Sequence, residues 1–181
     1  MAVLDAQATF SNLANGDSPT AIADNASANY YDQMQGGLNY SAPGGGAYIA
    51  PWIIVRVITA FAGTSSTIIA VLQDAPEPST TMVPTGPATW TDRLVGPTFT
   101  TGGAVAPSVN TYLLAARIPP SLDRYVRVIY RIAVNVMTAG NLHSFLTLDH
   151  DIIDIAMRKA STFVTQSGQV LEAVGNSIAA S

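Results

Sequence analysis

The sequence has no cysteine and few charged residues, and each shortage excludes a class of protein. The absence of cysteine from its 181 residues excludes a disulfide scaffold, a thiolate zinc site and a cysteine nucleophile. Charged residues make up 11% of the chain, against about 25% in typical soluble domains. Lys and Arg number 8 and Asp and Glu number 12. The clustered cations that phosphate contacts need are therefore lacking, and we expect no nucleic-acid partner.

Hydrophobic residues are plentiful but do not form a membrane span. They make up 48% of the chain, and the mean hydropathy is +0.27. A long uncharged stretch, residues 33–55, is interrupted by Pro43 and Gly44–Gly46, whereas a spanning helix needs about 20 predominantly apolar residues. Residues 1–55 contain no Lys or Arg, so we expect neither a secretory signal nor a membrane partner. The apolar surface must be covered by the core or by another chain.

The first third of the chain differs from the rest in charge and composition. Its only charged residues are Asp5, Asp17, Asp24 and Asp32, so the whole net charge of −4 lies there. We predict that residues 1–48 form an extended N-terminal arm with one short strand at Ala2–Phe10. Its large aromatic residues need cover, which favours an arm that becomes ordered on a partner. These aromatics are Phe10, Tyr30, Tyr31 and Tyr40.

Residues 49–150 show strand patterns separated by Gly and Pro. Trp52–Phe61 is rich in β-branched residues, and Thr67–Gln73 follows after a short Gly-containing turn, which predicts a hairpin. Two more strands are expected at Thr111–Ile118 and Leu142–Asp149. Strands do not alternate with helices, so a doubly wound sheet is disfavoured. The region is expected to fold as an all-β sandwich or barrel.

The clearest strand pattern is Tyr125–Val134. Apolar residues alternate with Arg127 and Arg131, which predicts a half-buried antiparallel strand with both arginines on one face. Together with Arg124 they form a local basic cluster. Two interpretations stay open: a solvated face with ion pairs worth about 0–1 kcal/mol, or guanidiniums that meet carboxylates of a neighbouring chain.

The last part of the chain changes from strand to helix periodicity. Ile153, Met157 and Ala160 are spaced as on one helix face, and Asp151 with Asp154 resembles a capping pair. A short helix is therefore predicted from about residue 152 to 163. We predict that residues 151–181 form this helix and a tail.

Candidate catalytic and metal patterns are weak. His150 lies between two aspartates, but the chain has only 2 histidines, so a capping cluster is favoured over a metal site. His143 and Ser144 are strand neighbours that point to opposite faces. Gly44–Gly46 lacks the lysine of a phosphate-binding loop. We expect no catalytic residue, metal or cofactor, with a carboxylate pair among the 12 acidic residues as an open alternative.

Several segments resemble the capsid cement (decoration) proteins of short-tailed bacteriophages. They are Leu4–Gln7 with Phe10-Ser11, Val55–Phe61, Thr67–Gln73, Pro119–Val128, and Thr138–Gly140 leading into Phe145-Leu146. The resemblance covers residues 4–149 in pieces, and its motifs are strands and turns. The chain departs from the family pattern at Gly36–Gly46, at Pro84–Pro107 and after Asp151.

The resemblance implies a jelly-roll β-sandwich that self-associates as a dimer or trimer. Such a protein binds the outer surface of an icosahedral phage head and clamps adjacent major capsid subunits. It would be made in the host bacterial cytoplasm and would end on the virion, without catalytic residues or cofactors. The expected interface residues are Phe10, Tyr30, Tyr31, Arg124, Arg127 and Arg131. The alternative is a carbohydrate-binding jelly-roll module of a phage tail or lectin type, with Trp52 and Trp90 as candidate aromatics.

Overall fold

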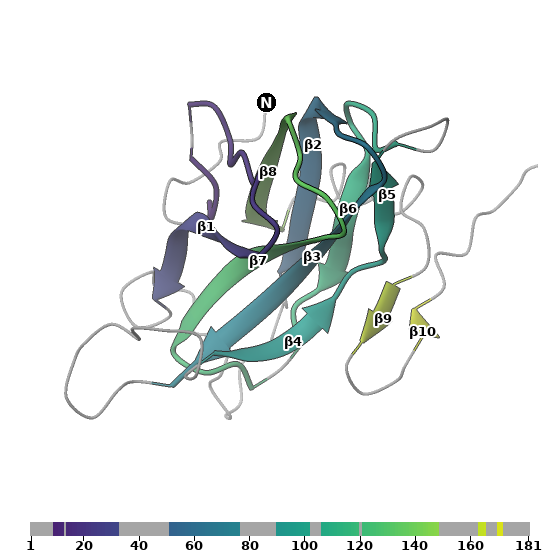
Figure 1. Cartoon of the computed structure of the whole chain (residues 1–181). Helices are drawn as coiled ribbons and strands as arrows, with labels where there is room; N and C mark the ends of the chain where they lie inside the picture. The colour runs from purple at the N-terminus through teal and green to yellow at the C-terminus, as the bar shows by residue number, and fades with distance from the viewer. Residues whose placement is uncertain are drawn as a thin grey trace, which may run out of the picture.

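The described part of the chain is all β, as the sequence predicts. The computed structural model describes residues 9–12, 14–32, 51–76, 90–101, 106–119, 121–148, 163–165 and 170–171. These residues form ten strands in two antiparallel sheets and contain no helix (Figure 1). The predicted β-sandwich class is therefore confirmed at this level.

The larger sheet runs in the order β1-β7-β3-β4-β9-β10, and β5 also pairs with β3. Its strands are β1 (Asp24–Asp32), β3 (Ser66–Ala75), β4 (Thr91–Val95), β5 (Phe99–Thr101), β7 (Tyr125–Ala133), β9 (Phe163–Thr165) and β10 (Val170–Leu171). Asp24 lies opposite Arg131 across β1 and β7. Gln73 lies opposite Arg127 on one side and Asp92 on the other. This register brings polar side chains from four strands onto one face.

The smaller sheet has the order β6-β2-β8. β2 (Trp52–Ala62) lies between β6 (Tyr112–Arg117) and β8 (Ala139–Thr147). The N-terminal segment follows the outer edge of β8, where Thr9 bridges Phe145 and Asp17 bridges Leu142. This edge of the sheet is therefore covered by the chain itself.

The core is built from alternate residues of the strands. Val126, Val128, Tyr130 and Ile132 of β7 are buried and belong to one hydrophobic cluster with residues of the smaller sheet. The alternation predicted for Tyr125–Val134 is thus confirmed over β7. Burial of this apolar surface is the main term that favours the folded state. The outer face of β7 is more covered than expected, because Tyr125 and Ile129 are also buried.

The predicted hairpin between Trp52–Phe61 and Thr67–Gln73 is wrong, although both strands exist. β2 pairs with β6 and β8, whereas β3 pairs with β7, β4 and β5. The short turn therefore carries the chain from one sheet to the other. Ser65 in this turn has a φ of 54°. The turn residues show that the chain reverses, but they do not decide which strands become partners.

Part of the predicted arm belongs to the larger sheet. Residues 24–32 form β1, which the sequence analysis did not predict, and β1 pairs with β7. The register of this pair shifts between Ala26 and Tyr30, where the backbone N–H of Val128 donates to Ser27 Oγ at 3.3 Å. Asp, Asn, Ser and Ala are poor strand formers, so pairing with β7 decides the conformation.

Other predictions for the two ends of the chain lie largely outside the described residues. These are residues 2–8 of the short N-terminal strand and residues 152–162 of the C-terminal helix. Phe163, the last residue of that helix prediction, begins β9. The boundaries 1–48, 49–150 and 151–181 stay predictions.

Candidate functional site

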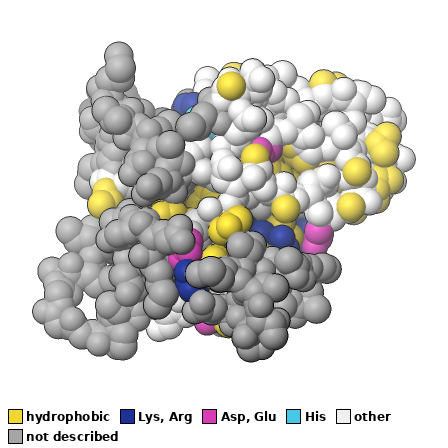
Figure 2. Space-filling model, turned by 90° about the vertical axis from the view of Figure 1, so that its left-hand side faces the viewer, with side chains coloured by type: hydrophobic (Ala, Val, Ile, Leu, Met, Phe, Trp, Pro, Cys, Tyr) yellow, Lys and Arg dark blue, Asp and Glu magenta, His cyan; other side chains and the backbone are white. Residues whose placement is uncertain are grey.

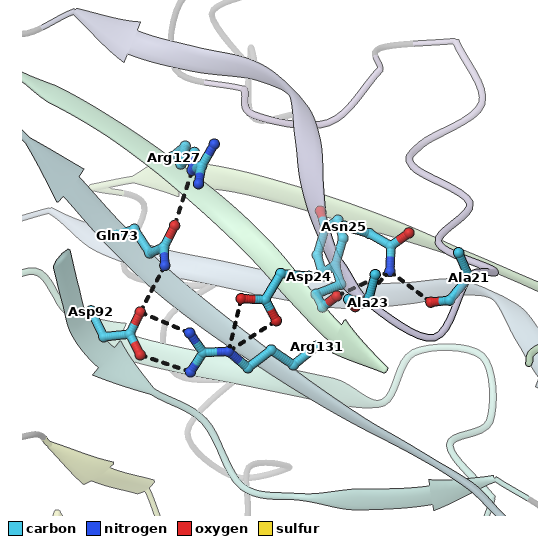
Figure 3. Close-up of polar contacts among 9 residues, drawn as sticks. Ala21, Ala23, Asp24, Asn25, Gln73, Asp92, Arg127 and Arg131 are labelled. Carbon is cyan, nitrogen blue, oxygen red and sulfur yellow. Dashed lines mark hydrogen bonds and ion pairs between the residues drawn. The ribbon is translucent and has the colours of Figure 1, made fainter. Parts of the chain in front are cut away.

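The outer face of the larger sheet collects polar and charged side chains from four strands. Figure 2 shows acidic and basic side chains lying next to one another on one face of the molecule. Five residues form a continuous chain of polar contacts, here called the outer-face network: Asp24, Arg131, Asp92, Gln73 and Arg127 (Figure 3). The five residues come from neighbouring strands, so their contacts run across the sheet. They add side-chain links to the backbone hydrogen bonds between the strands.

Arg131 is the centre of the outer-face network. Its Nε donates to both oxygens of Asp24 at 3.1 and 3.3 Å. Its Nη1 and Nη2 donate to Asp92 at 2.7 and 3.1 Å, a fork-like pair. Hydrogen bonding to Asp92 raises the pKa of Arg131 above its ordinary value. One guanidinium therefore joins β1, β7 and β4.

Gln73 extends the outer-face network from Asp92 to Arg127. Its Nε2 donates to Asp92 Oδ1 at 2.7 Å, and its Oε1 accepts from Arg127 Nε at 3.0 Å. Burial acts to raise the pKa of Asp92, but hydrogen bonds from Arg131 and Gln73 outweigh it and lower the pKa. The Asp92 carboxylate is thus held in its charged form.

Arg127 has surroundings that differ from those of Arg131. Its Cζ lies 4.0 Å from the centroid of the Trp90 ring, within cation–π range. Burial lowers the pKa of Arg127, and the negative charge of Asp24 acts in the opposite direction. Among the described residues, no carboxylate forms an ion pair with this guanidinium. Arg127 is held by an amide and an aromatic ring.

Arg124 directly precedes β7, and Tyr30 of the neighbouring strand β1 lies near this beginning of β7. Arg124 Nε and Nη2 donate to the two oxygens of Asp32 at 3.0 and 2.9 Å. The guanidinium also lies 4.9 Å from the centroid of the Tyr125 ring. Tyr30 packs edge-on against Tyr125 with centroids 5.8 Å apart and is 46% exposed. Tyr30 is therefore accessible, whereas Arg124 is paired within the chain.

A further ion pair lies where β3 ends and β4 begins. The fully buried Asp74 accepts from Arg93 Nε at 2.7 Å and from the backbone N–H of Asp123 at 2.7 Å. Arg93 Nη2 also lies 3.5 Å from Asp123 Oδ2. Hydrogen bonding to Asp74 raises the pKa of Arg93. A buried carboxylate needs such donors, because an unpaired charge in the interior is costly.

The predicted interface residues divide into core and surface. Phe10 and Tyr31 are 1% and 3% exposed and belong to the hydrophobic core, so a partner docking on the folded chain would not reach them. Arg124 and Arg131 meet carboxylates, but those of their own chain. Both arginines thus form ion pairs within the chain, and their role in an interface stays a prediction. Tyr30 and Arg127 are the predicted residues that stay available.

A second polar cluster lies between the sheets and the N-terminal segment. The buried Tyr130 hydroxyl donates to Asp17 Oδ2 at 3.0 Å and lies 2.9 Å from Ser144 Oγ. Asp17 also accepts from the backbone N–H groups of Asn12 and Ala28. Burial raises the pKa of Asp17, while these hydrogen bonds act to lower it. The cluster fixes the N-terminal segment on the sandwich.

Other sequence candidates find no catalytic or metal partners in the part of the chain that is described. Those residues include no group of three or more His, Asp or Glu side chains that could hold a metal ion. Ser144 bonds Tyr130 and Ser11, and the His143 ring packs against Phe145 with centroids 5.5 Å apart. Within the same residues no helix has the length and apolar character to cross a membrane. His150 and Gly44–Gly46 lie outside them.

Sequence reasoning found the arginines of this face but missed their partners. Asp24 and Asp32 share one face of β1, a strand without a recognisable pattern. Gln73 and Asp92 carry no sequence signal that distinguishes them from other polar strand residues. A scan against protein-family models finds no match, and a search of curated proteins finds no significant match.

Proposed function

We propose that this chain is a structural virion protein, a capsid cement (decoration) protein. In this proposal a jelly-roll sandwich binds the outer surface of an icosahedral phage head and clamps adjacent major capsid subunits. The observation that carries the proposal is the resemblance of its strand and turn segments to this family. The described parts of these segments fall on ordered elements: Val55–Phe61 in β2, Thr67–Gln73 in β3, Tyr125–Val128 in β7 and Phe145-Leu146 in β8.

The cross-strand ties of the larger sheet suit a clamp. A head filled with DNA is under internal pressure, and a clamp resists it by burying surface across subunit joints. A specific interface buries about 1,200–2,000 Å², and repeated copies reinforce one another through multivalency. The outer-face network joins β1, β7, β3 and β4 by side chains as well as by the backbone. We expect such a face to resist deformation, because separating its strands would break these contacts as well.

Exposed apolar residues at one end of the sandwich support self-association. The backbone N–H groups of Ile132 and Met137 donate to Ala23 and Thr20 oxygens, which aligns residues 20–23 with 132–137. Three exposed side chains lie along this alignment, namely Ile22 (53%), Val134 (65%) and Val136 (55%). Apolar residues grouped in this way favour contact with another chain. The proposed assembly is a dimer or trimer.

The test uses heads of the phage that encodes the chain, stripped of their decoration. Purified protein should rebind these heads at a fixed copy number and raise the temperature at which they release DNA. Light scattering after size exclusion should give a dimer or trimer. A monomer that does not sediment with the heads would contradict the proposal.

Carbohydrate binding is the alternative that the same protein can be tested for. A sugar needs an open aromatic face, but Arg127 covers one face of Trp90 at 4.0 Å. Trp52 is half-buried, with Arg117 6.0 Å from its ring centroid. We therefore expect no signal on a glycan array, and strong binding there without head binding would favour the alternative.

A further inference from the structure

We propose that Arg127 is an anchoring residue whose guanidinium, held against Trp90, binds a carboxylate side chain of the partner protein. The inference rests on the proposed function and gives the chemistry of one contact in it. Its starting point is the difference between Arg127 and the neighbouring arginines. Arg131 is paired with Asp24 and Asp92, Arg124 with Asp32, and Arg93 with Asp74. In the described part of the chain, Arg127 has no such ion pair.

The position of Arg127 is fixed although its hydrogen bonding is incomplete. Nε donates to Gln73, and the guanidinium plane rests on the Trp90 ring. Its two terminal nitrogens donate no hydrogen bond among the described residues, and the residue is partly exposed. In Figure 3 Arg127 stands at the end of the outer-face network. The side chain is thus held in place, and within the described ranges its two terminal nitrogens have no acceptor.

The chemistry of the Arg127 guanidinium favours an acceptor group with two oxygens. A carboxylate matches the planar fork of a guanidinium and forms two charge-assisted hydrogen bonds with it.

The surroundings of Arg127 and the proposed partner together indicate which carboxylate binds. Asp24 and Asp92 already lie in the outer-face network with Arg131. Arg127 and Arg131 balance these two carboxylates, so the network has no net charge to hold a multiply charged anion, and the proposed partner is a protein. The proposed occupant is therefore an Asp or Glu side chain of a protein.

The experiment measures binding to the stripped heads at a series of free protein concentrations. It compares the wild type with Arg127→Gln, Arg127→Lys and the control Arg117→Gln. Arg117 is exposed on the other sheet and also lies over a tryptophan, so it matches the change in charge and in ring contact. Urea unfolding confirms that each variant folds.

Arg127→Gln should weaken binding at least about tenfold, because it removes the charged fork. Arg127→Lys should also lose affinity, though less, and it carries the test if the Gln variant does not fold. Arg117→Gln should stay within about twofold. Higher salt should weaken the wild type more than Arg127→Gln, since only the wild type has the charged contact.

Each contrary result has a distinct meaning. Equal binding of wild type and Arg127→Gln would overturn the anchoring role and leave the cement function standing. Weaker binding with an unchanged salt dependence would point to a neutral acceptor and overturn the carboxylate. An equal loss of affinity in Arg117→Gln would show that the effect comes from the change in net charge, and it would overturn the anchoring role. Failure of the wild type to bind would remove the proposed function and this inference together.

Discussion

Asp24 on β1 and Arg131 on β7 lie directly opposite each other, and the same guanidinium reaches across β3 to Asp92 on β4. The two carboxylates come from positions 107 and 39 residues away from Arg131. One side chain thus holds together an early strand, a central strand and a late one. The energetic value of this arrangement can be measured.

The Arg131–Asp92 pair should contribute measurably to stability. We expect Arg131→Gln to lower the free energy of unfolding by about 1–2 kcal/mol, because a forked pair within a network exceeds an isolated surface pair. The side chains of Arg131 and Asp92 are 35% and 19% exposed, so part of the effect should disappear at high salt. A double-mutant cycle with Asp92→Asn should give a coupling of about 0.5–1 kcal/mol. Zero coupling at low salt would contradict the network.

His143 should make stability depend on pH. Burial lowers its pKa from the ordinary 6.5, the charge of Arg56 lowers it further, and Asp17 acts in the opposite direction. Below 6.5 the unfolded chain binds a proton more readily than the folded one does. The stabilisation is therefore complete above pH 6.5 and is lost as the pH falls through the lowered pKa. Urea unfolding at pH 7.5 and 5 should show a larger loss in the wild type than in His143→Gln.

The His143 titration itself supplies the control. Arg56 lies opposite His143 in the β2–β8 register. Arg56→Gln should therefore raise the pKa of His143, as followed by NMR. An unchanged pKa would show that burial alone accounts for the shift.

Gly140 should be intolerant of any side chain. Its φ is +131°, and a Cβ there would collide with the ring of Phe61. We expect Gly140→Ala to cost about 2–4 kcal/mol, through backbone strain and overpacking. Ala139→Ser, an exposed neighbour in the same strand, should change stability by less than about 0.5 kcal/mol. Similar midpoints of thermal unfolding for the two variants would contradict this geometry.

The protein should become more stable when Val134 is replaced by glycine. It has a φ of 78°, an unusual conformation for a β-branched residue, and it is 65% exposed. Val134→Gly relieves this strain and removes little buried surface, so unfolding should become less favourable by about 0.5–1 kcal/mol. Val136→Gly, without positive φ, should lower stability. A loss in both variants would mean that the Val134 side chain packs more tightly than its exposure indicates.

The strands that could be predicted are those whose sequence carries its own signal. β2, β3, β6, β7 and β8 are rich in apolar and β-branched residues, and their positions follow from that pattern. β1 has the sequence DNASANYYD, which lacks the pattern, and it forms because β7 offers an edge with which to pair. The presence of these five strands could therefore be predicted from their own sequences. The presence of β1 and the pairing partners of β2 and β3 could not, because they depend on the tertiary fold.

The candidate site shows the same limit. Alternation in β7 placed Arg127 and Arg131 on one face, and the structure agrees with it. Whether each arginine had an internal carboxylate depended on residues far away in the sequence. Arg127 and Arg131 occupy equivalent positions in the alternating pattern. The strand register places carboxylates beside Arg131 but not, among the described residues, in an ion pair with Arg127.

The interleaving of the sheets also limits how the protein can be made. β2, β6 and β8 of the smaller sheet alternate in chain order with strands of the larger one. No contiguous fragment that ends before β8 holds all strands of the smaller sheet. A nascent chain on the ribosome therefore cannot close its core until residue 147 has emerged from the exit tunnel. Two complementary fragments would have to associate before either could acquire native structure.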